Sequence, residues 1–341
     1  MLRRALIIVL VALQLHYSMS AAAAAEPAAN LGRGASVATK QTNDDDAETI
    51  AVAEVFEQLT EEEKEDAAKS SSYRYLKTAR CSKDKRDELA KAMIMRYVHT
   101  EHVLGSKQSL WADRALSKIR STIEYRSVMQ VDDIRTCFDR DKKDSDTHRS
   151  IRAMLEGRYE SKGSVIRGYG KKGQALFLNY PRCETKWDEE SFVAGNIYML
   201  ERALAATERR TDGKVTKILN FYDYNGYAMR NSPPPLLIAR LMSDLRDHWP
   251  DRLEGVYIVD SPWIFRTFWR IIKVFIDPVT IGLVNFVTGE EQKEILKGMI
   301  DEDQAAPFMY EGGKAEGEAD MRRFFYDIPT DMVYTVGHGK I

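Results

Sequence analysis

The second half of the chain alternates strand and helix signals, and this alternation limits its fold more than any other feature. Strand-like runs rich in β-branched and aromatic residues are expected over 215–222, 255–259 and 282–288. Amphipathic runs of helical spacing are expected over 191–207, 235–248 and 290–299. Strands that alternate with helices form largely parallel sheets with right-handed crossovers. The sequence therefore predicts an α/β fold with a mainly parallel sheet flanked by helices.

Upstream of this region, apolar residues recur every three or four positions, as on the buried side of amphipathic helices. Three such stripes are Val52, Val55, Phe56 and Leu59; then Leu89, Met93 and Tyr97; then Trp111, Ala115, Ile119 and Ile123. A shorter stripe at Ile151, Met154 and Leu155 predicts one more helix. We expect a helical module over 47–126, a connecting segment over 127–146, the α/β domain over 147–316 and a C-terminal tail over 317–341.

The first residues have the composition of a signal peptide. Arg3 and Arg4 precede an apolar run over 5–15, and small residues over 21–25 fit a cleavage site. We expect a signal peptide over 1–25 and a linker over 26–46. The predicted location is the secretory pathway, meaning the endoplasmic reticulum lumen, secretion or onward transport to an organelle. The alternative is an uncleaved anchor that leaves the protein at the cytoplasmic face of a membrane.

Charge and cysteine content exclude several classes of protein. Lys and Arg number 50 and Asp and Glu number 52, so no global charge favours a nucleic-acid partner. Cys81, Cys137 and Cys183 are too few and too far apart for a disulfide framework or a zinc cluster. At most one bridge can form among them, and the sequence does not say whether it does.

A glycine pattern at Gly168, Gly170 and Gly173 matches G-x-G-x-x-G. A dinucleotide site needs a helix that opens on the last glycine, with its N-terminus facing the pyrophosphate. Residues 174–180, "QALFLNY", are strand-like instead, so the glycines are expected to form a hairpin turn. An α/β enzyme that binds a nucleotide at this turn is kept as the third alternative.

Other catalytic and metal motifs are missing from the sequence. It contains no G-x-S-x-G, no H-E-x-x-H and no paired Cys and His spacing. His99 and His102 share a helical face at i, i+3, but no carboxylate-rich motif accompanies them, so they are interpreted as surface histidines. We expect no enzymatic activity, no cofactor and no metal.

The segment 263–280, "WIFRTFWRIIKVFIDPVT", combines large apolar residues with a row of cations. On a helical wheel Arg266, Arg270 and Lys273 occupy one narrow arc. A broad arc holds Ile264, Phe265, Phe268, Trp269, Ile271, Ile272, Phe275 and Ile276. Pro278 is expected to end the helix. The segment is either a core helix with a solvated basic edge or a helix that meets a membrane, where three cations contribute about 3 kcal/mol.

This segment also carries a family resemblance. "VDSPWIFRTFWRIIKVFIDPVT", preceded by "HWPDR" at 248–252 and followed by "PFMYEGG" at 307–313, resembles the C-terminal half of a CRAL-TRIO lipid-transfer domain. "ALSKIRSTIEYR" at 115–126 is similar to the end of the family's helical module. The resemblance covers about 80–316. It implies a sheet that forms the floor of an apolar cavity, and a hydrophobic gate helix that forms its movable wall.

The resemblance also implies roles for individual residues. Lys273 matches a family lysine that contacts a lipid phosphate, but Arg240 stands where inositol-binding members have a glutamate, which leaves a cationic clamp. Ile218 and Asn220 stand where choline-binding members have hydroxyl residues. The lipid-binding set is Lys273, Arg240, Asn220, Tyr222, Ile218, Phe268, Ile272 and Phe275. The membrane-contact set is Arg266, Arg270 and Trp269.

The expected function is binding of a phospholipid or other small hydrophobic ligand and its transfer between membranes. Exposing about 30 methylenes to water at ~0.8 kcal/mol each costs on the order of 20 kcal/mol, so a carrier must enclose the acyl chains. The alternative is a lipid-sensing adaptor that recruits a protein without transferring lipid. The expected partners are the ligand and a transient membrane surface, with no nucleic acid, and the protein is expected to be a monomer.

Overall fold

The computed structural model describes residues 34–78, 81–140, 145–315 and 317–334, with side chains from residue 44 onward. The chain divides into two compact units, residues 1–45 and 46–341. The expected signal peptide over 1–25 lies outside the described residues. Among the described residues, no helix has both the length and the apolar character needed to cross a bilayer.

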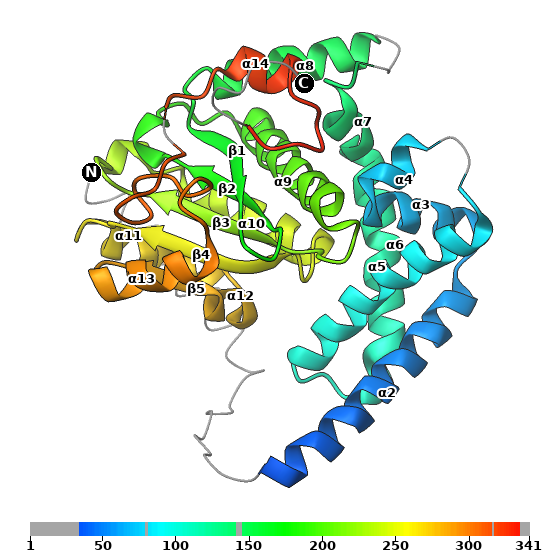
Figure 1. Ribbon diagram of the computed structural model, residues 1–341. Coiled ribbons are helices and arrows are strands. Elements are labelled where there is room, and N and C mark those ends of the chain that lie inside the picture. The colour runs from blue at the N-terminus through cyan, green and yellow to red at the C-terminus, as the bar shows by residue number, and fades with distance from the viewer. Residues whose placement is uncertain (1–33, 79–80, 141–144, 316, 335–341) are drawn as a thin grey trace, which may run out of the picture. The chain divides into compact units, whose positions relative to one another are not determined.

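A five-stranded sheet in the order β1-β2-β3-β4-β5 forms the centre of the second unit (Figure 1). β1 pairs antiparallel with β2, and all other neighbouring pairs are parallel. The strands are β1 (Ser164–Tyr169), β2 (Ala175–Asn179), β3 (Ile218–Asp223), β4 (Leu253–Val259) and β5 (Val284–Val287). The predicted α/β class with a mainly parallel sheet is confirmed.

The glycine motif makes the predicted hairpin between β1 and β2. Gly168 and Gly173 have φ values of 78° and 93°, which only glycine adopts without strain. β2 begins two residues after Gly173, and its five residues are all buried. Because the strand β2 follows the last glycine, no helix opens on that glycine as the dinucleotide fingerprint requires.

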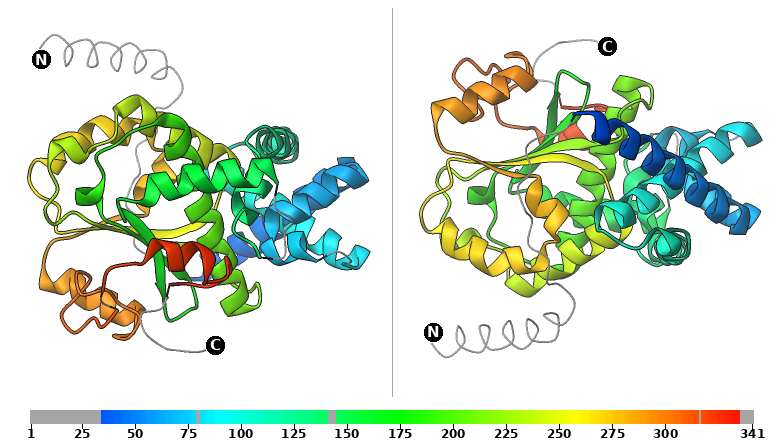
Figure 2. Two further views of the ribbon diagram at one scale, coloured as in Figure 1. Left: turned by 90° about the horizontal axis from the view of Figure 1, so that it is seen from above. Right: turned by 90° about the horizontal axis from the view of Figure 1, so that it is seen from below.

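Helices cover both faces of the sheet, and α10 and α13 lie on opposite faces (Figure 2). They are α9 (Glu189–Thr211), α10 (Pro235–His248), α11 (Phe265–Ile272), α12 (Pro278–Gly282) and α13 (Glu290–Met299). α10 and α13 match the predicted ranges at both ends. α9 runs past the predicted end at 207 because its stop is Asp212, which adopts the left-handed conformation with φ 53°. β3 consequently begins three residues later than predicted.

The expectation for Pro278 is wrong. α11 ends at Ile272, and a short 3-10 turn, η4 (Lys273–Phe275), follows it. Pro278 is instead the first residue of α12, and the Asp277 side chain accepts a hydrogen bond of 2.9 Å from the Thr280 N–H. Proline suits the first helical position because its fixed φ is helical and its missing N–H has no helical partner there.

The N-terminal helices form a second core beside the sheet. Most residues at the predicted stripe positions are buried, among them Val52, Val55, Met93, Ala115 and Ile119, while Leu89 and Ile123 are half-buried. The helices are α2 (Gly34–Gln58), α3 (Glu61–Ser71), α4 (Tyr73–Lys77), α5 (Lys83–Val103), α6 (Trp111–Val128), α7 (Val131–Thr136) and α8 (Asp146–Tyr159). Short 3-10 turns are η1 (Gln108–Leu110), η2 (Pro181–Cys183) and η3 (Met229–Asn231). The predicted helical region before the sheet is confirmed.

The chain after residue 317 returns to the sheet and packs on it. α14 (Met321–Tyr326) buries Phe324 and Phe325. The Tyr334 N–H donates a hydrogen bond of 2.7 Å to the Ile166 carbonyl at the edge of β1. This segment therefore contributes to the main core.

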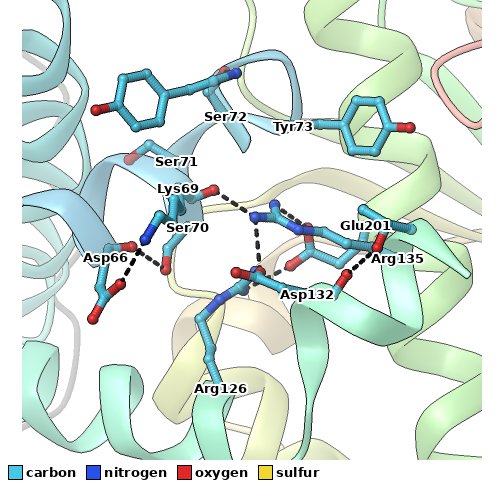
Figure 3. A network of polar contacts seen from close by, with 12 residues as sticks. Asp66, Lys69, Ser70, Ser71, Ser72, Tyr73, Arg126, Asp132, Arg135 and Glu201 are labelled. Carbon is cyan, nitrogen blue, oxygen red and sulfur yellow. Dashed lines mark hydrogen bonds and ion pairs between the residues drawn. The ribbon is translucent and has the colours of Figure 1, made fainter. Parts of the chain in front are cut away.

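A buried ionic network joins the helical module to the sheet region (Figure 3). Glu201 of α9 accepts hydrogen bonds from Arg126 of α6 at 2.7 Å and from Arg135 of α7 at 3.2 Å. It also accepts one from the Trp249 indole N–H at 2.8 Å. Arg135 donates a further bond of 2.7 Å to the Lys69 carbonyl at the end of α3. One carboxylate thus holds helices from both parts, together with the tryptophan of "HWPDR".

Candidate functional site

The predicted site lies where one face of the sheet meets α10 and α11. In the sheet register Tyr222 of β3 is opposite Ile258 of β4, which is opposite Phe286 of β5. Residues opposite one another in a sheet share a face. Their apolar neighbours form a group that we call the α11 cluster: Tyr224, Tyr227, Ile238, Ile258, Phe265, Phe268 and Ile272. Tyr222 and Met242 pack against it.

α11 turns one side to this cluster and the other to solvent. Phe265, Phe268 and Ile272 are buried, at the i, i+3, i+7 spacing of one helical face. Arg266 and Arg270 are exposed. The amphipathic pattern predicted for this segment is therefore present, with its apolar residues against the sheet and its cations outward.

A polar group interrupts the apolar face of the sheet. The Asn179 side-chain amide donates to the Asn220 side-chain oxygen at 2.7 Å, and Asn220 donates to the Tyr222 hydroxyl at 3.4 Å. Ser164 donates to the Asn179 oxygen at 2.9 Å, which fixes the orientation of that amide. Burial raises the pKa of Tyr222, so its hydroxyl stays neutral and able to donate a hydrogen bond. Asn220 and Tyr222 are half-buried and can supply polar contacts within an apolar wall.

Exposed apolar side chains concentrate around α11. Within the described residues, five of the thirteen exposed large hydrophobic residues lie between 263 and 286. We call them the apolar rim: Trp263, Val274, Val279, Ile281 and Phe286. Trp263 is 78% exposed, although tryptophan side chains are on average highly buried in folded proteins. Contiguous exposed apolar patches are typical of surfaces that bind a protein or a membrane.

The cations of this segment lie in the same stretch as the apolar rim. Arg266, Arg270 and Lys273 are exposed. In the described part of the chain, none of the three forms an ion pair with a carboxylate, whereas most other exposed cations of the sheet region do. Their charge is therefore available to an external anionic surface.

The other predicted site residues differ in their burial and in the part of the fold to which they belong. Ile218 is fully buried in the large apolar core formed by the sheet and α9, and it does not belong to the α11 cluster. Phe275 is half-buried in η4. Trp269, expected to contact a membrane, is half-buried with its ring 5.5 Å from the Phe286 ring. Trp263, which is not among the predicted membrane-contact residues, is the exposed tryptophan of the segment.

Lys273 and Arg240, the two cations of the expected phosphate clamp, differ in their ionic partners. Arg240 lies on α10, where it pairs with Glu189 at 2.6 Å and with Asp244 at 3.8 Å. Lys273 begins η4, which packs against α10. Within the part of the chain that the structure describes, Lys273 forms no ion pair with an acid, unlike Arg240.

Sequence reasoning missed Asn179, Tyr224 and Tyr227. Asn179 ends β2 directly opposite Tyr222, so the pairing of β2 with β3 would have identified it. Tyr224 and Tyr227 follow β3 and pack their rings on Phe265, at centroid distances of 4.1 and 6.1 Å. Their position depends on the path of the loop after β3, which carries no periodic signal.

Two pockets lie away from the α11 cluster. The larger, of about 460 Å³, lies between α4 and residues 326–331 and is lined in part by Tyr73, Lys77 and Asp139. The smaller, of about 10 Å³, lies beside Arg96 and Arg252 and has room for about one water. The lipid cavity expected behind α11 is therefore still a prediction.

Comparisons with known proteins agree on the family of this region. The sequence model of the CRAL/TRIO domain matches residues 159–312. The SEC14 cytosolic factor of Kluyveromyces lactis is 27% identical over 144 residues, which is 42% of this chain and 44% of that protein. Phosphatidylinositol transfer protein PDR17 of Saccharomyces cerevisiae is 27% identical over 143 residues, which is 41% of this chain and 39% of that protein. The match thus spans less than half the length of these relatives.

A solved structure shares the fold. The crystal structure of Sfh5 superposes with a TM-score of 0.52 at 12% identity, covering 74% of this chain and 84% of that one. At this identity the likeness concerns the fold alone.

The predicted location in the secretory pathway is wrong in light of these relatives. Several of them are named cytosolic factors, including those of Kluyveromyces lactis and Candida glabrata. The prediction depended on residues 1–25, which lie outside the part that the structure describes.

Proposed function

Since residues 159–312 of the chain form a CRAL/TRIO domain, we propose that the protein binds one phospholipid or similar hydrophobic ligand and transfers it between membranes. The ligand's acyl chains would lie between the sheet face of β3 and β4 and the buried side of α11. One relative is named a phosphatidylinositol transfer protein, which supports a phospholipid as the ligand class.

The observation that carries the proposal is that α11 is amphipathic, with buried apolar residues on one side and exposed cations on the other. Phe265, Phe268 and Ile272 close an apolar wall, while the cations and the apolar rim face solvent. A lipid carrier must keep acyl chains from water and release them only where a bilayer replaces water. A helix that is apolar toward the sheet and cationic toward solvent can act as a wall that moves on contact with an anionic membrane.

Release at the membrane depends on α11 being movable. α11 is eight residues long and η4 follows it directly. Its buried residues are the apolar Phe265, Phe268 and Ile272. The apolar rim would enter the headgroup region, and Arg266 and Arg270 would contact lipid phosphates. We propose that this contact shifts α11 away from the sheet and opens the ligand site.

Replacing Lys273 with alanine tests the headgroup role. Lys273 is exposed and forms no ion pair with any described acid, so its replacement should leave the melting temperature unchanged. Transfer of an anionic phospholipid should fall about 5-fold, because one cation near a phosphate contributes about 1 kcal/mol. The matched control is Lys214→Ala, another exposed lysine, far along the chain from α11. Equal transfer by the Lys273 variant and the wild type would refute the headgroup role.

A transfer assay between donor and acceptor vesicles tests the function itself. Fluorescent phosphatidylinositol and phosphatidylcholine are loaded into donors, and movement to acceptors is followed with and without the full chain. The proposal predicts transfer that is proportional to protein concentration. Ligand binding without movement between vesicles would identify a lipid-sensing adaptor and contradict the transfer proposal.

A further inference from the structure

Helices α2 and α5 bring together three side chains of metal-ligand type. Glu48 lies on α2, and His99 and His102 lie one turn apart on α5. The side chains come from positions about 50 residues apart, and they meet at the edge of the helical core that contains Ala51 and Val98. This group lies outside the α11 cluster and has no part in the proposed lipid site.

The three side chains converge on one carboxylate oxygen. The Glu48 Oε1 atom is 3.0 Å from Nδ1 of His99 and 2.7 Å from Nδ1 of His102. The potential ligand atoms of the three residues all lie within 4.8 Å of one another. Glu48 is 8% exposed, while the two imidazoles are half-buried and reachable by an ion from solvent.

From this arrangement we infer a binding site for a divalent transition metal, with zinc as the best match, formed by Glu48, His99 and His102. Two imidazoles and one carboxylate are a ligand set that zinc accepts, with a water at the fourth position. Zinc bonds of about 2.0–2.1 Å in a tetrahedron place ligand atoms roughly 3.4 Å apart. The present distances of 2.7 and 3.0 Å need outward shifts of well under 1 Å to reach that spacing.

Ligand chemistry decides which cation fits. Mg²⁺ and Ca²⁺ prefer oxygen ligands in larger number, whereas two nitrogen donors favour Zn²⁺ and its neighbours in the transition series. The ring of Trp111 lies against His102, with centroids 4.7 Å apart, and limits the rotation of that imidazole. The site is therefore selective by donor type and partly preorganised by packing.

A metal at this position would fix α2 to α5. α2 contributes Val52, Val55 and Phe56 to the helical core, but its attachment at Glu48 relies on hydrogen bonds. A ligand that binds the folded chain and not the unfolded one stabilises the folded state in proportion to its free concentration. We infer that a bound zinc ion links α2 to α5 and so stabilises the part of the helical core nearest to Glu48.

Isothermal titration of the full chain with Zn²⁺ tests the site. The Cys81→Ser background is used because Cys81 is an exposed free thiol, and thiolates are themselves zinc ligands. We expect one equivalent of Zn²⁺ to bind and to raise the melting temperature, and Mg²⁺ to do neither. His99→Ala and Glu48→Gln should each weaken binding at least 10-fold, which is the smallest loss usual for disturbed metal sites.

The matched control is Glu57→Gln, which makes the same charge change at an exposed position of α2. Substitution of Co²⁺ for Zn²⁺ gives a second readout, because a tetrahedral site produces strong visible absorption and His99→Ala should abolish it. Zinc binding that is equal in the wild type, His99→Ala and Glu48→Gln would overturn the inference. So would a wild-type chain that binds no zinc while it remains folded.

Discussion

Replacing Glu201 with glutamine should lower the free energy of unfolding by about 3–5 kcal/mol, the cost typical of removing one partner from a buried ion pair. Glu201 is 4% exposed and accepts hydrogen bonds from Arg126, Arg135 and the Trp249 indole. The two arginines are buried as well, at 7% and 1% exposure. Without the carboxylate, both guanidinium groups keep the cost of burial and lose the charge that offsets it.

The contribution of Glu201 should also appear in the pH dependence of the free energy of unfolding. Burial alone would raise the pKa of Glu201, but Arg126 and Arg135 outweigh it and lower that pKa to about 2. A carboxyl group whose pKa is lower in the folded than in the unfolded state stabilises the fold above its unfolded pKa. This stability, on the order of 3 kcal/mol from a shift between 4.5 and about 2, should disappear as the pH falls through that interval.

Urea denaturation at pH 7 and at steps between pH 5 and pH 2 measures both effects. Glu124→Gln, the same change at an exposed site on α6, should alter stability by less than about 0.5 kcal/mol. Glu201→Gln should also flatten the acid dependence over this range. A variant as stable as the wild type would show that the network of Figure 3 does not hold the helical module to the sheet.

The double reversal Arg266→Glu and Arg270→Glu should nearly abolish binding to anionic vesicles. Both arginines are exposed and, within the described residues, neither pairs with an acid. Each reversal removes an attraction of about 1 kcal/mol and adds a repulsion of similar size, so the two together change the binding free energy by about 4 kcal/mol. That corresponds to roughly a 1,000-fold weaker affinity.

Co-sedimentation with vesicles rich in phosphatidylserine measures this effect, and vesicles of phosphatidylcholine alone provide the comparison. The wild type should bind the anionic vesicles more strongly, and salt should reduce the difference because it screens exposed charges. The matched control is Lys83→Glu with Lys107→Glu, which makes the same charge change on the helical module. If both double variants lose binding equally, the contact is due to net charge and not to the α11 surface.

Periodicity was sufficient to predict most of the fold. α10 and α13 follow their amphipathic patterns from end to end, because each pattern continues to the residue where the helix stops. The errors lie at boundaries. Asp212 ends α9 through a left-handed conformation that has no strong sequence signal, and Pro278 begins a helix where it was expected to end one. Both depend on local backbone geometry that composition does not encode.

The candidate site was predicted less completely because its contacts are distant in sequence. The amphipathic pattern identified Phe268 and Ile272, whose burial follows from helical spacing. Asn179 was missed because its role depends on the register between β2 and β3. Glu48 was missed although a signal existed. Glu48 lies four residues before Val52 and therefore on the same apolar side of the helix. A carboxylate buried there needs a polar partner.

Native mass spectrometry tests the central claim most directly. The full chain is incubated with vesicles of mixed phospholipids, separated from them by size exclusion and measured intact, and the bound lipid is then extracted and identified. We predict a mass increase of one phospholipid per chain, which disappears on extraction with organic solvent. A folded chain that leaves the vesicles with no lipid of any headgroup would contradict an enclosed ligand between the sheet and α11.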